Sequence, residues 1–287
     1  MFHKIVSFFC FIIKSKNEHG VHSPFVFDLI TSCFYKKKDK NDLTIFSDYK
    51  KQLSKNTLLL EILSFNFMSR LLLSHKSKRS RFFKNSEISN KRARLLIHLI
   101  QYLKPKNILE IGTGFGINTV VLSSAQRNSK ITTLEENEQV VKAIKEMFEK
   151  NTVKNVKFLT GNFDITLPRV FNNNTYDFIH FKGSCANKII LKHFESSLLS
   201  IDNNSVFLFE NIHSNKESEK VWNYIKKHKK VTVTIDTFLW GFVFFRKEQE
   251  KEHFIIKDVI EEIVGEINDE FDTTIALRFI IQKKQSP

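Results

Sequence analysis

Cysteine is scarce in this 287-residue chain, and the three cysteines present are far apart. Cys10, Cys33 and Cys185 are odd in number, and they form neither a C-x-x-C pair nor a Cys/His zinc spacing. A small domain held together by disulfides is therefore excluded, and so is a zinc module built on these residues. This usage favours a reducing compartment, and we expect a cytoplasmic protein.

Long hydrophobic runs are also missing from the N-terminal part. The apolar run Ile5–Ile13 has nine residues, whereas a helix that crosses a bilayer needs about 20. No small-residue cleavage site follows it, so we expect no transmembrane segment, and an amphipathic or buried first helix rather than a signal peptide or membrane-surface anchor. The 41% hydrophobic content, with 29 Phe, is ample for a core, which excludes wholesale disorder.

Acidic residues are scarce in the first third of the sequence. Residues 1–106 contain 21 basic and 7 acidic side chains, and the difference equals the net charge of +14 of the whole chain. Helical patterns separated by basic stretches such as 75–81 predict a basic helical N-terminal extension over 1–106, whose last helix stops at Pro105. Genome bias can explain why the cations are lysines but not why acids are so few. An acidic small-molecule substrate or a phosphate-bearing partner is therefore worth testing.

Glycine is rare as well, and three of the eight glycines fall in one five-residue turn. The turn follows a predicted strand that carries Glu110, and it opens a helix. Glycine lets a ligand approach backbone N–H groups without a Cβ in the way. The spacing G-x-G-x-G differs from the G-x-G-x-x-G of dinucleotide sites, and an acid before it suits a cofactor with a cationic amino-acid end. We predict cofactor binding by Glu110, Gly112, Thr113, Gly114 and Gly116.

Beyond residue 106 the sequence alternates short β-rich runs with helical patterns, which is typical of an α/β fold. The last two runs lack a helix between them and should pair antiparallel at one edge of an otherwise parallel sheet. Seven strands are expected, at 107–111, 130–134, 156–159, 177–181, 205–209, 231–236 and 240–245. This predicts a domain over 107–257, followed by an acidic helical C-terminal appendage over 258–287.

Two further groups come at the ends of predicted strands next to the glycine turn. Glu135 ends the second strand, where an acid can accept hydrogen bonds from both hydroxyls of a ribose. Asn162 and Phe163 follow the third strand, where an amide could read an adenine edge and a ring could pack on its face. Because open α/β sheets bind ligands at the carboxyl ends of their strands, we predict that these residues belong to the same cofactor site.

With these motifs, residues 90–257 resemble class I S-adenosylmethionine-dependent methyltransferases. The segments His19–Phe27, Thr232–Asp236 and Gly241–Arg246 are similar to a bacterial, O-methyltransferase-like branch with an N-terminal helical extension. The resemblance implies a Rossmann-like sheet, S-adenosyl-L-methionine as cofactor and a small-molecule substrate. It also implies that Glu110 and the three glycines form the cofactor loop, that Glu135 is the ribose acid, and that Asn162 lies on the adenine side.

The sequence departs from that branch at the ends of the fourth and fifth strands. Lys182 stands where the branch has an Asp before glycine, and only Glu210 of an acidic pair is kept, followed by Asn211. Because hard cations prefer carboxylate oxygens, we predict no catalytic metal. Lys182, Glu210 and His213 are candidate bases or orienting groups. A solvated or salt-bridged Lys182 and a plain loop histidine are the alternatives, and His180 is expected to be a satisfied core histidine.

Three functions remain open. The first is methyl transfer to an oxygen or nitrogen of a small molecule. The second is a methyltransferase-like binding protein that has lost turnover, which Lys182 and the altered pair Glu210-Asn211 suggest. The third is RNA methylation, with the basic N-terminal part binding phosphates. No RNA-binding module or base-methylating motif is visible, so nucleic acid ranks below a small molecule. The oligomeric state is not indicated.

Overall fold

The computed structural model describes residues 2–37, 39, 42–56, 88–151, 153–182 and 188–257. The basic stretch 75–81 and the appendage 258–287 lie outside the described residues, as does Cys185. The expectations placed on them therefore stay predictions.

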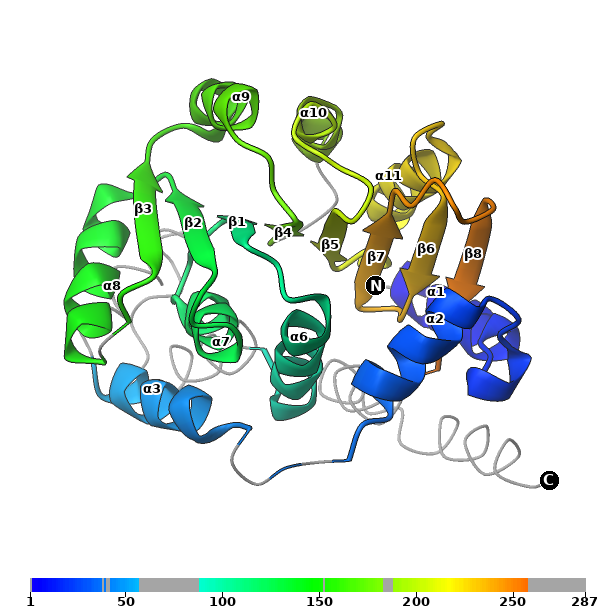
Figure 1. Cartoon of the computed structure of the whole chain (residues 1–287), viewed down its shortest axis with the longest axis horizontal. Coiled ribbons are helices and arrows are strands. Elements are labelled where there is room, and N and C mark those ends of the chain that lie inside the picture. The colour runs from blue at the N-terminus through cyan, green and yellow to red at the C-terminus, as the bar shows by residue number, and fades with distance from the viewer. Residues whose placement is uncertain are drawn as a thin grey trace.

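A central sheet of eight strands runs through the molecule (Figure 1) in the order β3-β2-β1-β4-β5-β7-β6-β8. Its strands are β1 (Asn107–Ile111), β2 (Lys130–Glu135), β3 (Val156–Thr160), β4 (Phe178–Phe181), β5 (Val206–Glu210), β6 (Val233–Asp236), β7 (Trp240–Phe244) and β8 (Glu252–Ile255). Only β7 is antiparallel to its neighbours, β5 and β6. The predicted α/β class, the mostly parallel sheet and the reversed strand pair at 231–245 are confirmed.

The eighth strand was not expected from the sequence. β8 pairs in parallel with β6, from Val233 opposite Glu252 to Asp236 opposite Ile255. It has only four residues, and Glu252 and His253 are exposed. So short and polar a segment has no hydrophobic alternation from which a strand could be read.

Helices cover both faces of the sheet. One face is covered by α6 (Asn90–Leu103), α7 (Ile117–Ala125) and α8 (Glu138–Lys150), and the other by α9 (Phe163–Asn173), α10 (Lys188–Ser197) and α11 (Lys216–Lys227), as Figure 1 shows. Neighbouring side chains of a strand point to opposite faces. Accordingly Ile108 belongs to the hydrophobic cluster on the first face and Leu109 to the cluster on the second.

The N-terminal extension is part of this core. It contains α1 (Phe2–Lys14), a 3-10 turn (Glu18–Gly20), α2 (Pro24–Leu29), a π-helical turn (Ile30–Phe34) and α3 (Thr44–Lys55). Phe8 and Phe11 of α1 pack edge-on against Phe238, and Phe25 against Phe244. The first helix is thus amphipathic, one of the two forms expected, and its buried face shares one hydrophobic cluster with the sheet.

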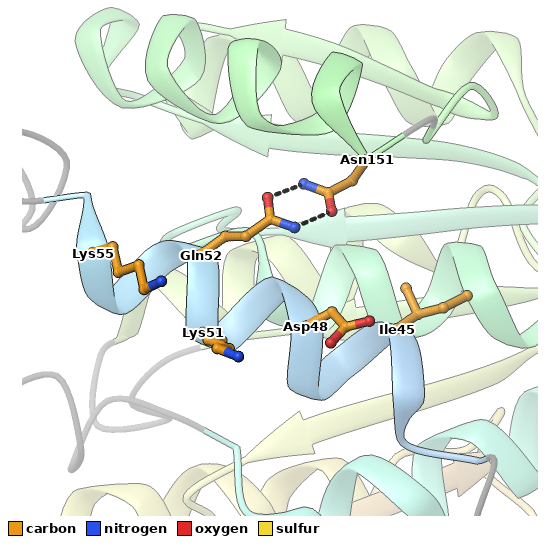
Figure 2. Close-up of a pocket in the computed structure, with 6 residues that line it drawn as sticks. All are labelled: Ile45, Asp48, Lys51, Gln52, Lys55 and Asn151. Atoms are coloured by element: carbon orange, nitrogen blue, oxygen red, sulfur yellow. Dashed lines mark hydrogen bonds between the residues drawn. The ribbon is translucent and has the colours of Figure 1, made fainter.

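α3 is fastened to the end of α8 by a pair of amides. Gln52 and Asn151 each donate a hydrogen bond to the other's side-chain oxygen, both 2.9 Å long (Figure 2). The two residues line a surface hollow of about 380 Å³ together with Ile45, Asp48, Lys51 and Lys55. This contact holds α3 against the helices on the first face of the sheet, next to the glycine turn.

Candidate functional site

The glycine turn lies at the point where the strand order reverses. β1 is flanked by β2 and β4, so the loop after β1 and the residue after β4 meet at the carboxyl edge of the sheet. Open α/β sheets bind ligands at such a switch point. Gly112, Gly114 and Gly116 all have positive φ, at 96°, 53° and 71°. This left-handed backbone explains why glycine occupies these positions.

Gly116 serves packing rather than ligand approach. A Cβ at this position would lie 2.8 Å from the hydroxyl of Tyr49 and 2.9 Å from Cγ2 of Ile144. Tyr49, on α3, is fully buried and donates a hydrogen bond of 3.0 Å to the carbonyl of Phe115 inside the turn. Sequence reasoning missed Tyr49, because nothing in the sequence places residue 49 beside residue 115.

Glu110 lies beneath the turn and is fully buried. Its Oε2 accepts hydrogen bonds from the hydroxyls of Thr119, at 2.5 Å, and Thr133, at 2.8 Å. Its Oε1 has no hydrogen-bond partner in the described structure. Burial raises the pKa of Glu110, although the nearby charges of Lys182 and His180 act in the opposite direction. The buried carboxyl can therefore act on a ligand through the turn that follows it, not by direct contact.

His180 connects two acids across the sheet. It is fully buried on β4 in register with Glu110, and its Nδ1 lies 3.9 Å from Glu110 Oε1 without a hydrogen-bond partner. Its Nε2 donates to Glu210 Oε1 over 2.9 Å. The expectation of a satisfied core histidine holds for one ring nitrogen only. The link between the two acids could have been suspected from the sequence, because His180 is a polar residue on a central strand and the neighbouring strand carries Glu110.

Glu210, at the end of β5, is an ionised acceptor. Asn118 donates a second hydrogen bond to its Oε1, of 3.1 Å. Burial opposes ionisation, but the hydrogen bond from His180 and the charges of His180, Lys182 and Arg92 outweigh it and lower the pKa of Glu210 to about 2. A carboxylate with so low a pKa is a weak base, and it suits orientation and charge better than proton abstraction.

Lys182, directly after β4, reaches back over the glycine turn. Its Nζ donates a hydrogen bond of 2.9 Å to the carbonyl of Thr113, and its backbone N–H bonds to Ile111. A Cβ at Gly114 would lie only 3.0 Å from this Nζ. Lys182 is thus neither simply solvated nor bonded to Glu210, which were the alternatives considered from the sequence. Thr113 itself is buried, and its hydroxyl bonds to that of Thr133.

Glu135 borders the same turn from β2. Its Oε2 accepts a hydrogen bond of 3.0 Å from the backbone N–H of Gly114, and its Oε1 accepts from the N–H groups of Glu136 and Asn137. The backbone of Gly161 bonds to the carbonyl of Glu135, so the loop after β3 lies alongside. The structure therefore brings together the loops after β1, β2, β3 and β4.

Asn162 and Phe163 lie at the start of α9. The Asn162 side chain caps this helix by accepting from the N–H of Asp164 at 2.9 Å, and the side chain is exposed. Phe163 is half-buried, with its ring edge-on to His193. Asn162 thus has a structural task besides the adenine contact predicted for it.

His213 does not fit the role of a base. Its Nδ1 donates to Glu219 at 2.9 Å and its Nε2 to Asp236 at 2.8 Å, so both ring nitrogens are engaged. Burial opposes its charge, but these two carboxylates outweigh burial and raise the pKa of His213 to about 9. With a carboxylate bonded to each nitrogen, the ring has no nitrogen left to accept a proton from a substrate, which argues against the base expected from the sequence. Its place is structural, with the ring stacked on Phe238.

The described residues contain neither a metal-binding group nor a membrane-spanning helix. They hold no group of three or more His, Cys, Asp or Glu side chains that could bind a metal ion. Among the helices formed by the same residues, none is long and apolar enough to cross a membrane.

Several solved structures share this fold. The SAH-bound methyltransferase PaMTH1 of Podospora anserina is 14% identical, with a TM-score of 0.57 over 79% of this chain and 97% of that chain. The O-methyltransferase of Bacillus cereus is 16% identical (TM-score 0.51; 76% and 97% covered), and TomG of Streptomyces achromogenes is 14% identical (TM-score 0.52; 76% and 95% covered). At sequence identities this low, the similarity to these structures shows the fold only, and it confirms the predicted Rossmann-like class.

The sequence itself gives the family. A comparison with curated proteins finds no match. A family model described as a methyltransferase domain matches residues 103–271, which is more than half of the chain. The match includes the glycine turn, Glu135, Lys182 and Glu210. The chain therefore belongs to the methyltransferase domain family.

Proposed function

We propose that this protein is an S-adenosyl-L-methionine-dependent methyltransferase that acts on an oxygen or nitrogen of a small molecule, without a catalytic metal. The observation that carries the proposal is the meeting of the glycine turn, Glu135 and the buried Glu110 at the switch point of the sheet. The PaMTH1 and Bacillus cereus structures hold SAH, and the TomG structure holds SAM.

The described residues fit this cofactor. Gly112 and Gly114 open a cradle that a Cβ would narrow, and Glu110 beneath it keeps one unpaired oxygen. Bound S-adenosylmethionine would supply an electrophilic methyl group on a sulfonium. Glu135 is suited to accept hydrogen bonds from ribose hydroxyls, and the resemblance assigns Glu110 to the cofactor loop. We retain Asn162 and Phe163 as adenine-side candidates.

Transfer of a methyl group from a bound cofactor to a bound acceptor depends mainly on alignment of the two and on exclusion of water. Lys182 and Glu210 are the proposed groups that orient the acceptor, whereas His213 is left out. One observation supports metal independence: Lys182 takes the place of the acid that the resemblance implies, and hard cations prefer carboxylate oxygens. An acidic acceptor would be favoured near the Lys182 ammonium.

Calorimetry with S-adenosylhomocysteine tests the proposal. We expect binding by the wild type, and an affinity about tenfold lower for Glu135→Gln, because a charge-assisted hydrogen bond contributes about 1.5–3 kcal/mol. Glu146→Ala, which removes an exposed acid on α8, is the matched control and should bind like the wild type. A pure, folded wild-type protein that does not bind would overturn the proposal.

A second candidate is a binding protein that keeps the cofactor site without turnover. The observation in its favour is the Lys182 ammonium lying in the glycine turn, bonded to Thr113. A panel of cell-extract metabolites and a radiolabelled methyl donor separate the two. Cofactor binding without labelled product supports this candidate, whereas labelled product dismisses it.

A further inference from the structure

Lys182 places a fixed positive charge inside the proposed cofactor cradle. Its Nζ is held by the Thr113 carbonyl at 2.9 Å and lies 3.0 Å from the position of a Gly114 Cβ. The backbone of Lys182 is fixed too, because its N–H bonds to Ile111 at 3.1 Å. The side chain is half-buried, so water screens its charge less than at an open surface.

Two buried acids explain why the ammonium lies there. Glu110 and Glu210 are both close enough to Lys182 for its charge to favour their ionised forms. Glu110 lies under the turn and Glu210 at the end of β5, with His180 between them. The negative charge of Glu210, which would attract a cationic ligand, is therefore already balanced in part by a cation of the chain itself.

The two forms of the cofactor differ in charge at one atom. S-Adenosylmethionine and S-adenosylhomocysteine share the adenosine and the amino-acid end, but only the donor carries a positive sulfonium. A fixed cation in the cradle repels the sulfonium and leaves the neutral thioether of the product unaffected. An acid in the position of Lys182 would have the opposite effect.

We propose that Lys182 sets the charge preference of the cofactor site: its ammonium weakens binding of the cationic donor and leaves binding of the neutral product S-adenosylhomocysteine unaffected. The inference rests on the proposed function and adds to it a specificity-determining residue.

The size of the effect follows from the charges. Two like charges held several ångströms apart at a partly buried site repel by enough to change a dissociation constant about tenfold. We therefore expect the ratio of the dissociation constants for donor and product to fall about tenfold when the lysine charge is removed.

Calorimetric titration of the full-length protein with each ligand separately tests the inference. Lys182→Met keeps the length of the side chain and removes its charge, so any effect of the extra methyl group on the donor is the same in both proteins. Lys182→Gln is a second neutral variant in case the first does not fold, and Lys182→Arg should keep the wild-type ratio. Lys142→Met, on the exposed side of α8, is the matched charge control.

The outcomes are distinguishable. A ratio of the dissociation constants for donor and product that falls about tenfold in the neutral variants, and not in Lys182→Arg or Lys142→Met, supports the inference. Binding of both ligands with a ratio that stays within twofold of the wild type in Lys182→Met and Lys182→Gln overturns it and leaves the proposed function intact. Failure of folded wild-type protein to bind either ligand overturns the proposed function and this inference with it.

Discussion

At the scale of single residues, backbone conformation and side-chain packing explain the glycine turn better than ligand approach alone. Gly112 and Gly114 face the Lys182 side chain, and Gly116 faces Tyr49, Ile144 and Phe148. The three glycines of this motif therefore have two roles. The first two leave space for a ligand, and the third allows α3 and α8 to pack against the turn.

Gly116→Ala should destabilise the protein by about 3 kcal/mol, because alanine is strained at φ 71° and its Cβ would overlap Tyr49 and Ile144. Urea denaturation measures the change. Gly20→Ala is the control, since its φ is not left-handed and the nearest atoms belong to the flexible Lys16 side chain. Equal stability of both variants would contradict the packing role.

The sequence could predict those residues of the site whose backbone is local to a motif. Glu110, the glycines and Glu135 follow strands whose pattern is legible, and they do meet. Tyr49 and the pairing of His180 with Glu210 could not be predicted, because they depend on which distant segments pack together. His213 was misjudged for the same reason: Asp236 and Glu219 come from elements that the sequence alone does not place beside it.

At the scale of elements, the imidazolium of His213 joins three parts of the fold. It bonds to Glu219 on α11 and to Asp236 on β6, and Glu219 also lies 3.2 Å from His3 on α1. Trp222 donates to the same carboxylate of Asp236. The region therefore depends on one half-buried positive charge between two negative ones.

The stability of this junction should depend on pH. The pKa of His213 is about 9 in the folded protein and 6.5 in its ordinary state, so its contribution is complete below pH 6.5 and is lost as pH rises through 9. We expect the free energy of unfolding to fall by about 3 kcal/mol over this interval. Urea titrations at several pH values measure it.

His213→Gln should lack this slope and be the less stable protein at pH 6. His19→Gln, which changes an exposed histidine, should keep the slope of the wild type. A slope that persists unchanged in His213→Gln would show that other groups cause it.

At the scale of the whole molecule, the basic extension and the sheet form one body. Phe8 and Phe11 from α1 and Tyr49 from α3 belong to the same hydrophobic cluster as Ile108 of β1. The charge boundary at residue 107 marks the start of the sheet but not a break in packing. The extension also supplies Arg92, whose guanidinium lies over Trp240 and whose charge favours the ionised Glu210.

A chain that begins at residue 90 should therefore fail to fold cooperatively, because it exposes the face of the sheet that the first helices cover. Thermal melting followed by circular dichroism compares it with the full chain. A fragment that unfolds cooperatively at the same midpoint would show that residues 90–287 fold without the first helices.

The short strand β8 has a consequence for solubility. An outermost strand offers unpaired backbone groups to which another molecule can add a strand, and this is a route to aggregation. Here Lys16 exchanges two backbone hydrogen bonds with the far end of β8, through Ile255 and Lys257. At the opposite margin, β3 is only five residues long and carries Lys157. Both margins of the sheet are thus protected against edge-to-edge association.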